Sequence, residues 1–185
     1  MSQKPKTVSP MSNEGRNTYV MEHITQALLK LLQKKSMDDI SISELCNCAG
    51  VGRASFYRNF KSKEDILEVY IGKLFEQWKQ DLECNSDFPL SELPGALFSH
   101  FEHNRDFYSL LNQKNLVYLL KDRIIQICGL TPGLPKMEVY AKAFAAYSLY
   151  GWVEVWFQRG MLESADEIRQ MFQSGIYKES FPRQA

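Results

Sequence analysis

Hydrogen-bond donors of several kinds gather between residues 53 and 63. Arg53, Ser55 and Tyr57 lie within five residues of one another, and Lys63 follows six residues later. An arginine can donate two hydrogen bonds to the edge of a guanine, while serine, tyrosine and lysine commonly hold phosphate. These residue types therefore predict a surface that contacts nucleic acid. The residues that carry such donors are Ser43, Arg53, Ser55, Tyr57, Arg58, Lys61 and Lys63, and these are predicted contact residues.

Two short helical patterns position these donors. Ser41 with Glu44 three residues later predicts a capping box that opens a helix over 42–49. Gly50 can take the positive φ that a sharp exit from this helix requires. In the next helix, over 53–60, Phe56 and Phe60 share one face, which we assign to the core. Two helices joined by a tight turn with glycine predict a helix-turn-helix.

The segment VGRASFYRNFKSKEDIL resembles the signature of the TetR family of bacterial transcription regulators, V-S-x-G-T-x-Y-x-Y-F-x-S-K-E-x-L. The matching residues are Val51, Tyr57, Phe60, Ser62, Lys63, Glu64 and Leu67. The sequence departs from the signature at Gly52, Ala54, Ser55 and Asn59. The resemblance places Arg53, Ala54, Ser55 and Tyr57 at the family's groove-facing positions, so Ala54 is a further predicted contact residue. In the family the tyrosine and the lysine commonly hold the DNA backbone. For Tyr57 a packed aromatic remains the alternative, and for Arg58 and Lys61 a purely solvated position.

The resemblance implies an all-α protein of about nine helices. Its expected parts are a disordered tail over 1–13, a three-helix DNA-binding domain over 14–62 and a helical regulatory and dimerisation domain over 63–185. Helical spacing of apolar residues predicts the individual helices. Their expected ranges are 14–35, 42–49, 53–60, 63–83, 90–103, 105–112, 115–128, 136–160 and 165–176.

The charge distribution agrees with this division. The chain has 22 basic and 22 acidic residues, so its net charge is zero. Residues 1–63 nevertheless hold ten Lys and Arg against five Asp and Glu, and the remainder is acidic. A basic N-terminal third is typical of a nucleic-acid-binding module, although chance unevenness of solvated charge would also produce it.

Most aromatic residues lie after position 63. The resemblance implies a small-molecule pocket in this region and dimerisation through the last two long helices; the alternative is that these aromatics form the core. The predicted pocket residues are Trp78, Phe98, Phe101, Phe107, Tyr108, Tyr118 and Tyr147. The predicted dimer residues are Tyr140, Phe144, Gly151, Trp152, Val155, Trp156, Ile168 and Phe172.

Two modes of regulation follow from resemblance. The family suggests a homodimeric repressor that a small-molecule inducer releases from a two-fold operator in double-stranded DNA. The run from Tyr140 to Ile168 resembles a TetR subgroup that includes the activator of a dihydroxyacetone-kinase operon. The alternative function is therefore an activator controlled by a protein partner.

Other classes of protein are disfavoured. The sequence has neither a nucleophile motif nor a phosphate-binding loop, so we expect no enzyme, no catalytic residue and no cofactor. Cys46 and Cys48 lack a second close cysteine pair, and His100 with His103 supplies only two ligands, so we expect no metal. No apolar run reaches the roughly 20 residues of a membrane span, and we expect a cytoplasmic protein.

Overall fold

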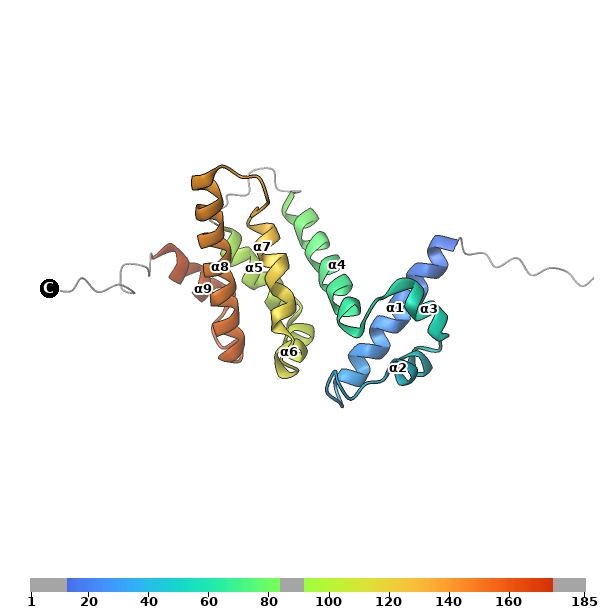
Figure 1. Cartoon of the computed structure of the whole chain (residues 1–185). Coiled ribbons are helices and arrows are strands. Elements are labelled where there is room, and N and C mark those ends of the chain that lie inside the picture. Colours follow the sequence, from blue (N-terminus) through green and yellow to red (C-terminus); the bar gives the residue numbers. More distant parts are fainter. Residues whose placement is uncertain (1–12, 84–91, 175–185) are drawn as a thin grey trace, which may run out of the picture. The chain divides into compact units, whose positions relative to one another are not determined.

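The computed structural model describes residues 13–83 and 92–174, and all regular structure there is helical (Figure 1). This confirms the all-α prediction. None of the described helices is both long and apolar enough to cross a membrane. Nine α-helices and one 3-10 helix, η2, follow one another in the described ranges. They are α1 (Asn13–Leu32), α2 (Ile42–Ala49), α3 (Arg53–Asn59), α4 (Lys63–Glu83), α5 (Leu93–His103), α6 (Arg105–Gln113), η2 (Val117–Leu120), α7 (Lys121–Ile127), α8 (Lys136–Gln158) and α9 (Ala165–Gln173).

The predicted helix boundaries agree with the structure to within a few residues at most ends. The largest difference concerns the single helix expected over 115–128, which is instead η2 followed by α7. Asn115 has a φ of 57°, a left-handed conformation, so helical structure begins only after it, at Val117. The predicted tail, apart from its last residue, and the predicted end of α9 at Ile176 lie outside the described residues.

Packing divides the chain into two compact units, with the boundary between Tyr70 and Ile71. In the N-terminal unit, α1 packs against both α2 and α3. Apolar side chains from all three helices are wholly buried there, and the start of α4 adds two more. They are Ile24, Leu28, Leu32, Leu45, Phe56, Ile66 and Leu67.

The C-terminal unit has an aromatic core drawn from α5, α6 and α8. The ring centroids of Phe98 and Trp156 are 5.0 Å apart, and those of Phe101 and Tyr108 are 4.7 Å apart. Phe157 joins the same cluster, 5.6 Å from Phe101. All five side chains are at most 1% exposed, so this cluster fixes the three helices against one another.

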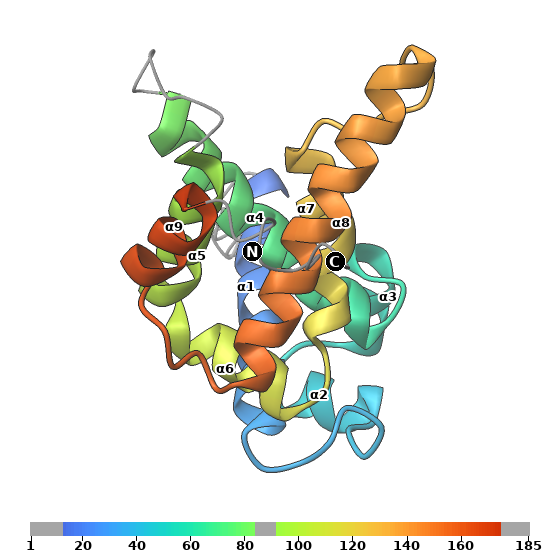
Figure 2. The same cartoon turned by 90° about the vertical axis from the view of Figure 1, so that its left-hand side faces the viewer.

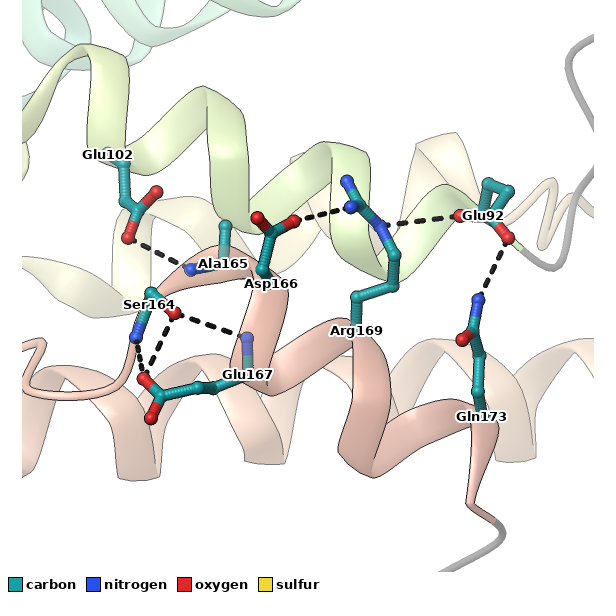
Figure 3. A network of polar contacts seen from close by, with 8 residues as sticks. All are labelled: Glu92, Glu102, Ser164, Ala165, Asp166, Glu167, Arg169 and Gln173. Atoms are coloured by element: carbon teal, nitrogen blue, oxygen red, sulfur yellow. Dashed lines mark hydrogen bonds and ion pairs between the residues drawn. The ribbon is translucent and has the colours of Figure 1, made fainter.

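Helix α9 lies beside α5 (Figures 1 and 2), and polar contacts fasten it there. At its start, Ser164 and Glu167 form a complete capping box. The N–H of Ala165 donates to Glu102 of α5 at 2.9 Å. Arg169 forms ion pairs with Glu92, at 3.3 Å, and with Asp166 (Figure 3). These polar contacts therefore hold α9 against α5.

Candidate nucleic-acid interface

The turn between α2 and α3 has the geometry that its residues predict. Ser41 accepts a hydrogen bond from the N–H of Glu44 at 3.1 Å and caps α2. Gly50 has a φ of 67° and ends the helix in the left-handed conformation. The N–H of Val51 then donates to Cys46 at 3.0 Å. This closes the turn and directs the chain into α3.

Only half of the capping box predicted for α2 forms. The carboxylate of Glu44 lies 2.6 Å from Lys35 rather than on the N–H of Ser41. A similar difference occurs at α4, where Ser62 accepts from the N–H of Asp65 but the Asp65 carboxylate accepts from the N–H of Lys61 at 2.8 Å. The tertiary position of Lys35 decides the first case, because a cation competes with the neutral backbone donor for the carboxylate.

Helix α3 is anchored by one face and open on the other. Phe56 is wholly buried, and Phe60, which follows the last helical residue, is 2% exposed. Both core assignments are therefore confirmed. Their ring centroids lie 6.1 Å apart.

The opposite face of α3 carries most of the predicted contact residues. Arg53, Ala54, Tyr57 and Arg58 are exposed, and Tyr57 retains 55% of its accessible surface. Ser55 is half-buried. An exposed tyrosine phenol and two exposed guanidinium groups, on a helix fixed by two buried phenylalanines, provide donors for base edges and phosphates.

The other predicted contact residues lie on neighbouring segments. Ser43 is exposed on α2, and Lys61 is exposed between α3 and α4. Lys63 is half-buried, and its ammonium group donates to the backbone carbonyls of Met37 and Ile40, the latter at 2.8 Å. An ammonium has three donors, so two of those on Lys63 already have protein partners. The sequence pattern alone carried no signal for this link between α4 and the 37–40 turn.

Cys46 is a core residue of α2. Its side chain is 2% exposed. Burial raises the pKa of the thiol, and the nearby charge of Arg53 opposes this shift. A neutral, buried thiol is a small apolar packing group rather than a metal ligand.

The predicted pocket residues lie in several environments within the C-terminal unit. Trp78 lines two cavities, of about 460 Å³ and about 310 Å³. Phe98, Phe101 and Tyr108 are wholly buried core residues. Phe107 is half-buried, and Tyr118 and Tyr147 are exposed.

One cavity brings together residues that the sequence reasoning did not assign to a pocket. The larger cavity is bordered by His100, whose Nε2 lies 2.8 Å from the Tyr108 hydroxyl. Burial, with a smaller contribution from the charge of His103, lowers the pKa of His100 to about 4. His100 is therefore a neutral core histidine near pH 7. His103 lies at the cavity edge and contacts the carbonyl of Ser99.

The predicted dimer residues form two groups on α8 and α9. Tyr140, Phe144 and Val155 are 53–68% exposed, whereas Trp156 and Ile168 are at most 4% exposed. An open hollow of about 550 Å³ lies between the two helices. Five of the eight predicted residues line it, namely Gly151, Trp152, Val155, Trp156 and Ile168. Phe172 lies beside Trp152, with ring centroids 4.1 Å apart.

Comparison with known proteins agrees with the geometry of the N-terminal unit. Residues 24–70 match the model of the family "Bacterial regulatory proteins, tetR family". The chain is 32% identical over 104 residues to the uncharacterized HTH-type transcriptional regulator YerO of Bacillus subtilis. It is 27% identical over 96 residues to the uncharacterized HTH-type transcriptional regulator YvkB of the same organism. These matches cover 52% and 48% of this chain but only 36% and 49% of the relatives, so the chain spans less than half the length of each relative.

A solved structure extends the similarity of fold to most of the chain. The fatty acid degradation regulator FadR from Bacillus halodurans superposes with a TM-score of 0.54 at 15% identity. The superposition covers 92% of this chain and 98% of that protein. At this identity the likeness shows the fold alone. The family match, the two regulator relatives and the geometry of α2 and α3 together show that residues 24–70 are a tetR-type helix-turn-helix region.

Proposed function

We propose that the protein is a homodimeric transcriptional repressor that binds a two-fold site in double-stranded DNA and is released by a small molecule. The observation that carries the DNA-binding part is the outward face of α3. Arg53, Tyr57 and Arg58 project from a helix whose other face is fixed by buried aromatic residues. Such a protein would act in the bacterial cytoplasm, where the DNA lies.

Dimerisation is supported by the surface of α8. We call the exposed side chains of Met137, Tyr140, Phe144, Tyr147 and Val155 the apolar stripe. The first four recur every three or four residues, and Val155 follows Tyr147 by eight residues, about two further helical turns, so all five share a helix face. Figure 2 shows that the N-terminal half of α8 extends beyond α9. A large exposed apolar surface is typical of an interface.

A dimer also suits the small size of α3. One seven-residue recognition helix offers few base contacts. Two linked helices can occupy half-sites one helical turn, about 34 Å, apart, and linkage raises their combined affinity. A second copy of the chain is therefore the partner we propose for the apolar stripe.

Release by a small molecule is supported by the two cavities that Trp78 lines on α4. Helix α4 begins at Lys63, directly after the helix-turn-helix, and continues into the C-terminal unit. A ligand that binds one conformation of this unit more tightly than another would shift the population of DNA-binding states. The alternative function, an activator controlled by a protein partner, rests on the resemblance of residues 140–168 to an activator subgroup, and it stays a prediction.

The direct test is selection of the protein on randomised duplex DNA, followed by titration of the enriched site at several salt concentrations. We expect a two-fold site. Arg53→Ala and Tyr57→Ala should weaken binding, each by roughly 1–3 kcal/mol. Arg58→Ala should lower the slope of log affinity against log salt by about one if the guanidinium contacts a phosphate.

Lys30→Ala is the matched control, because Lys30 is an exposed cation of α1 outside the predicted contact set. It should leave the affinity for the selected site unchanged. Two outcomes would contradict sequence-specific binding. One is that no DNA site is enriched, and the other is that Arg53→Ala and Tyr57→Ala bind as tightly as wild type.

A further inference from the structure

The smaller of the two cavities beside Trp78 has apolar walls and a charged edge. Its volume is about 310 Å³, at the lower end of the range for small-molecule pockets. Helices α4, α5 and α7 supply the walls. The apolar lining residues are Phe75, Trp78, Leu82, Leu93 and Ile127.

Arg123 places a positive charge at the edge of this cavity, which Lys79 and Glu76 also line. No ion pair joins Arg123 to Glu76 within the described parts of the chain. The cavity is therefore electrostatically suited to an anion. The larger cavity differs, because its edge holds Asp81 and the neutral His100.

Most donors of Arg123 are available to a ligand. Its guanidinium has five N–H donors, and its one hydrogen-bond partner among the described residues is Gln126, at 3.3 Å. A glutamine side chain leaves the positive charge uncompensated. A half-buried arginine in this state can bind a carboxylate through two parallel hydrogen bonds.

Gly72 allows Arg123 to take this position. A Cβ atom at residue 72 would lie 2.8 Å from Nη2 of Arg123 and 3.3 Å from its guanidinium carbon. Glycine is unfavourable within a helix, yet here it lies in the middle of α4. The absence of a side chain at this position lets the guanidinium lie directly against α4, next to Phe75 and Trp78 of the cavity wall.

We infer that this cavity is the subsite for an amphipathic carboxylate, with the apolar body against Phe75 and Trp78 and the carboxylate on Arg123. The inference rests on the proposed regulation by a small molecule and names the chemical class of that molecule. The planar guanidinium selects carboxylate over a neutral hydroxyl, because only the anion accepts two charge-assisted hydrogen bonds.

The test is calorimetric titration of the full chain, without DNA, with three probes that share one apolar body. They are 4-phenylbutyrate, 4-phenylbutan-1-ol and 4-phenylbutylamine. We expect the acid to bind about ten- to a hundredfold more tightly than the alcohol, and the amine to bind most weakly. Arg123→Gln should remove the preference for the acid over the alcohol.

Two further variants make the test specific. Gly72→Ala should displace the guanidinium and weaken binding of the acid without weakening binding of the alcohol. Lys121→Gln removes a positive charge from the same helix, outside the residues that line the cavity, and should leave the preference intact. Equal affinity for acid and alcohol, no binding of any probe, or a preference that survives Arg123→Gln would overturn the inference.

Operator binding, measured separately without ligand, distinguishes the two proposals. Acid binding that depends on Arg123 in a chain that fails to select a DNA site would sustain the subsite and refute the repressor. Selection of a DNA site by a chain that binds none of the probes would refute the subsite alone.

Discussion

The ammonium group of Lys63 lies 2.8 Å from the backbone carbonyl of Ile40 and also donates to that of Met37. These bonds join the first residue of α4 to the turn that precedes α2. Met37 and Ile40 are themselves buried, at 6% and 1% exposure. Lys63 therefore stabilises the N-terminal unit in addition to any contact with phosphate.

Lys63→Ala should lower the free energy of unfolding by about 1–2 kcal/mol, because two hydrogen bonds from a charged donor are lost. Urea denaturation measures this change. Lys61→Ala, at an exposed neighbouring position, should change stability by less than about 0.5 kcal/mol. Equal stability of Lys63→Ala and wild type would show that the two bonds contribute nothing in solution.

The buried His100 predicts a stability that falls in acid. Its pKa is lowered to about 4, first by burial and then by the charge of His103, whereas the unfolded chain has a value near 6.5. Between these values the unfolded state binds more protons, so stability rises with pH through this window. The stability linked to His100 is fully present above about pH 6.5. As the pH falls toward 4, the free energy of unfolding decreases by up to roughly 3 kcal/mol.

The difference between the unfolding free energies of wild type and His100→Gln, measured from pH 7 to pH 4, isolates this effect from carboxylates that titrate in both proteins. We expect the difference to decrease as the pH falls. His103→Gln, at an exposed position, should reproduce most of the wild-type slope. A pH-independent difference between wild type and His100→Gln would contradict the prediction.

The contact between α5 and α9 predicts that any side chain larger than that of Gly95 lowers the stability of the C-terminal unit. A Cβ atom there would lie 2.4 Å from Nε and 3.0 Å from Cγ of Arg169. Gly95→Ala should therefore destabilise the C-terminal unit by about 1–3 kcal/mol through overpacking. Thermal unfolding of a double-mutant cycle with Arg169→Ala checks this cause.

Arg169→Ala alone removes two partly exposed ion pairs and should cost no more than about 1 kcal/mol. In the background of Arg169→Ala, Gly95→Ala should cost little, because the clashing side chain is absent. Strictly additive effects in the cycle would exclude the steric explanation.

The apolar stripe predicts how charge affects assembly. Tyr140→Asp and Val155→Asp should each raise the dissociation constant of the dimer at least roughly a hundredfold, since the interface would bury an unpaired carboxylate in both subunits. Sedimentation velocity measures the assembly state. Gln113→Asp places the same charge at an exposed position on α6 and should leave assembly unchanged. A dimer that persists in both stripe variants would place the interface elsewhere.

Local sequence determined the helix-turn-helix. The caps at Ser41 and Gly50 depend on bonds within five residues along the chain, so residue types at fixed spacing suffice to predict them. The same holds for Phe56 and Phe60, which the helical period places on one face. The pattern also predicts the exposed side of α3, since the face opposite two buried aromatics is left for solvent or DNA.

Aromatic residues of the C-terminal unit show where local pattern is insufficient. Tyr108 is the same residue type as Tyr118 and Tyr147, yet Tyr108 is wholly buried and the other two are exposed. Apolar periodicity indicates that a helix buries a face, but only the packing of several helices decides which aromatics meet.

The sequence by itself determined most of the helices, the caps at Ser41 and Gly50 and the exposed face of α3, because these depend on neighbours a few residues apart. The tertiary structure alone decided that Lys63 binds carbonyls more than twenty residues away along the chain, and that Arg123 of α7 lies against Gly72 of α4. Such contacts depend on how distant segments pack, and residue spacing carries no information about them.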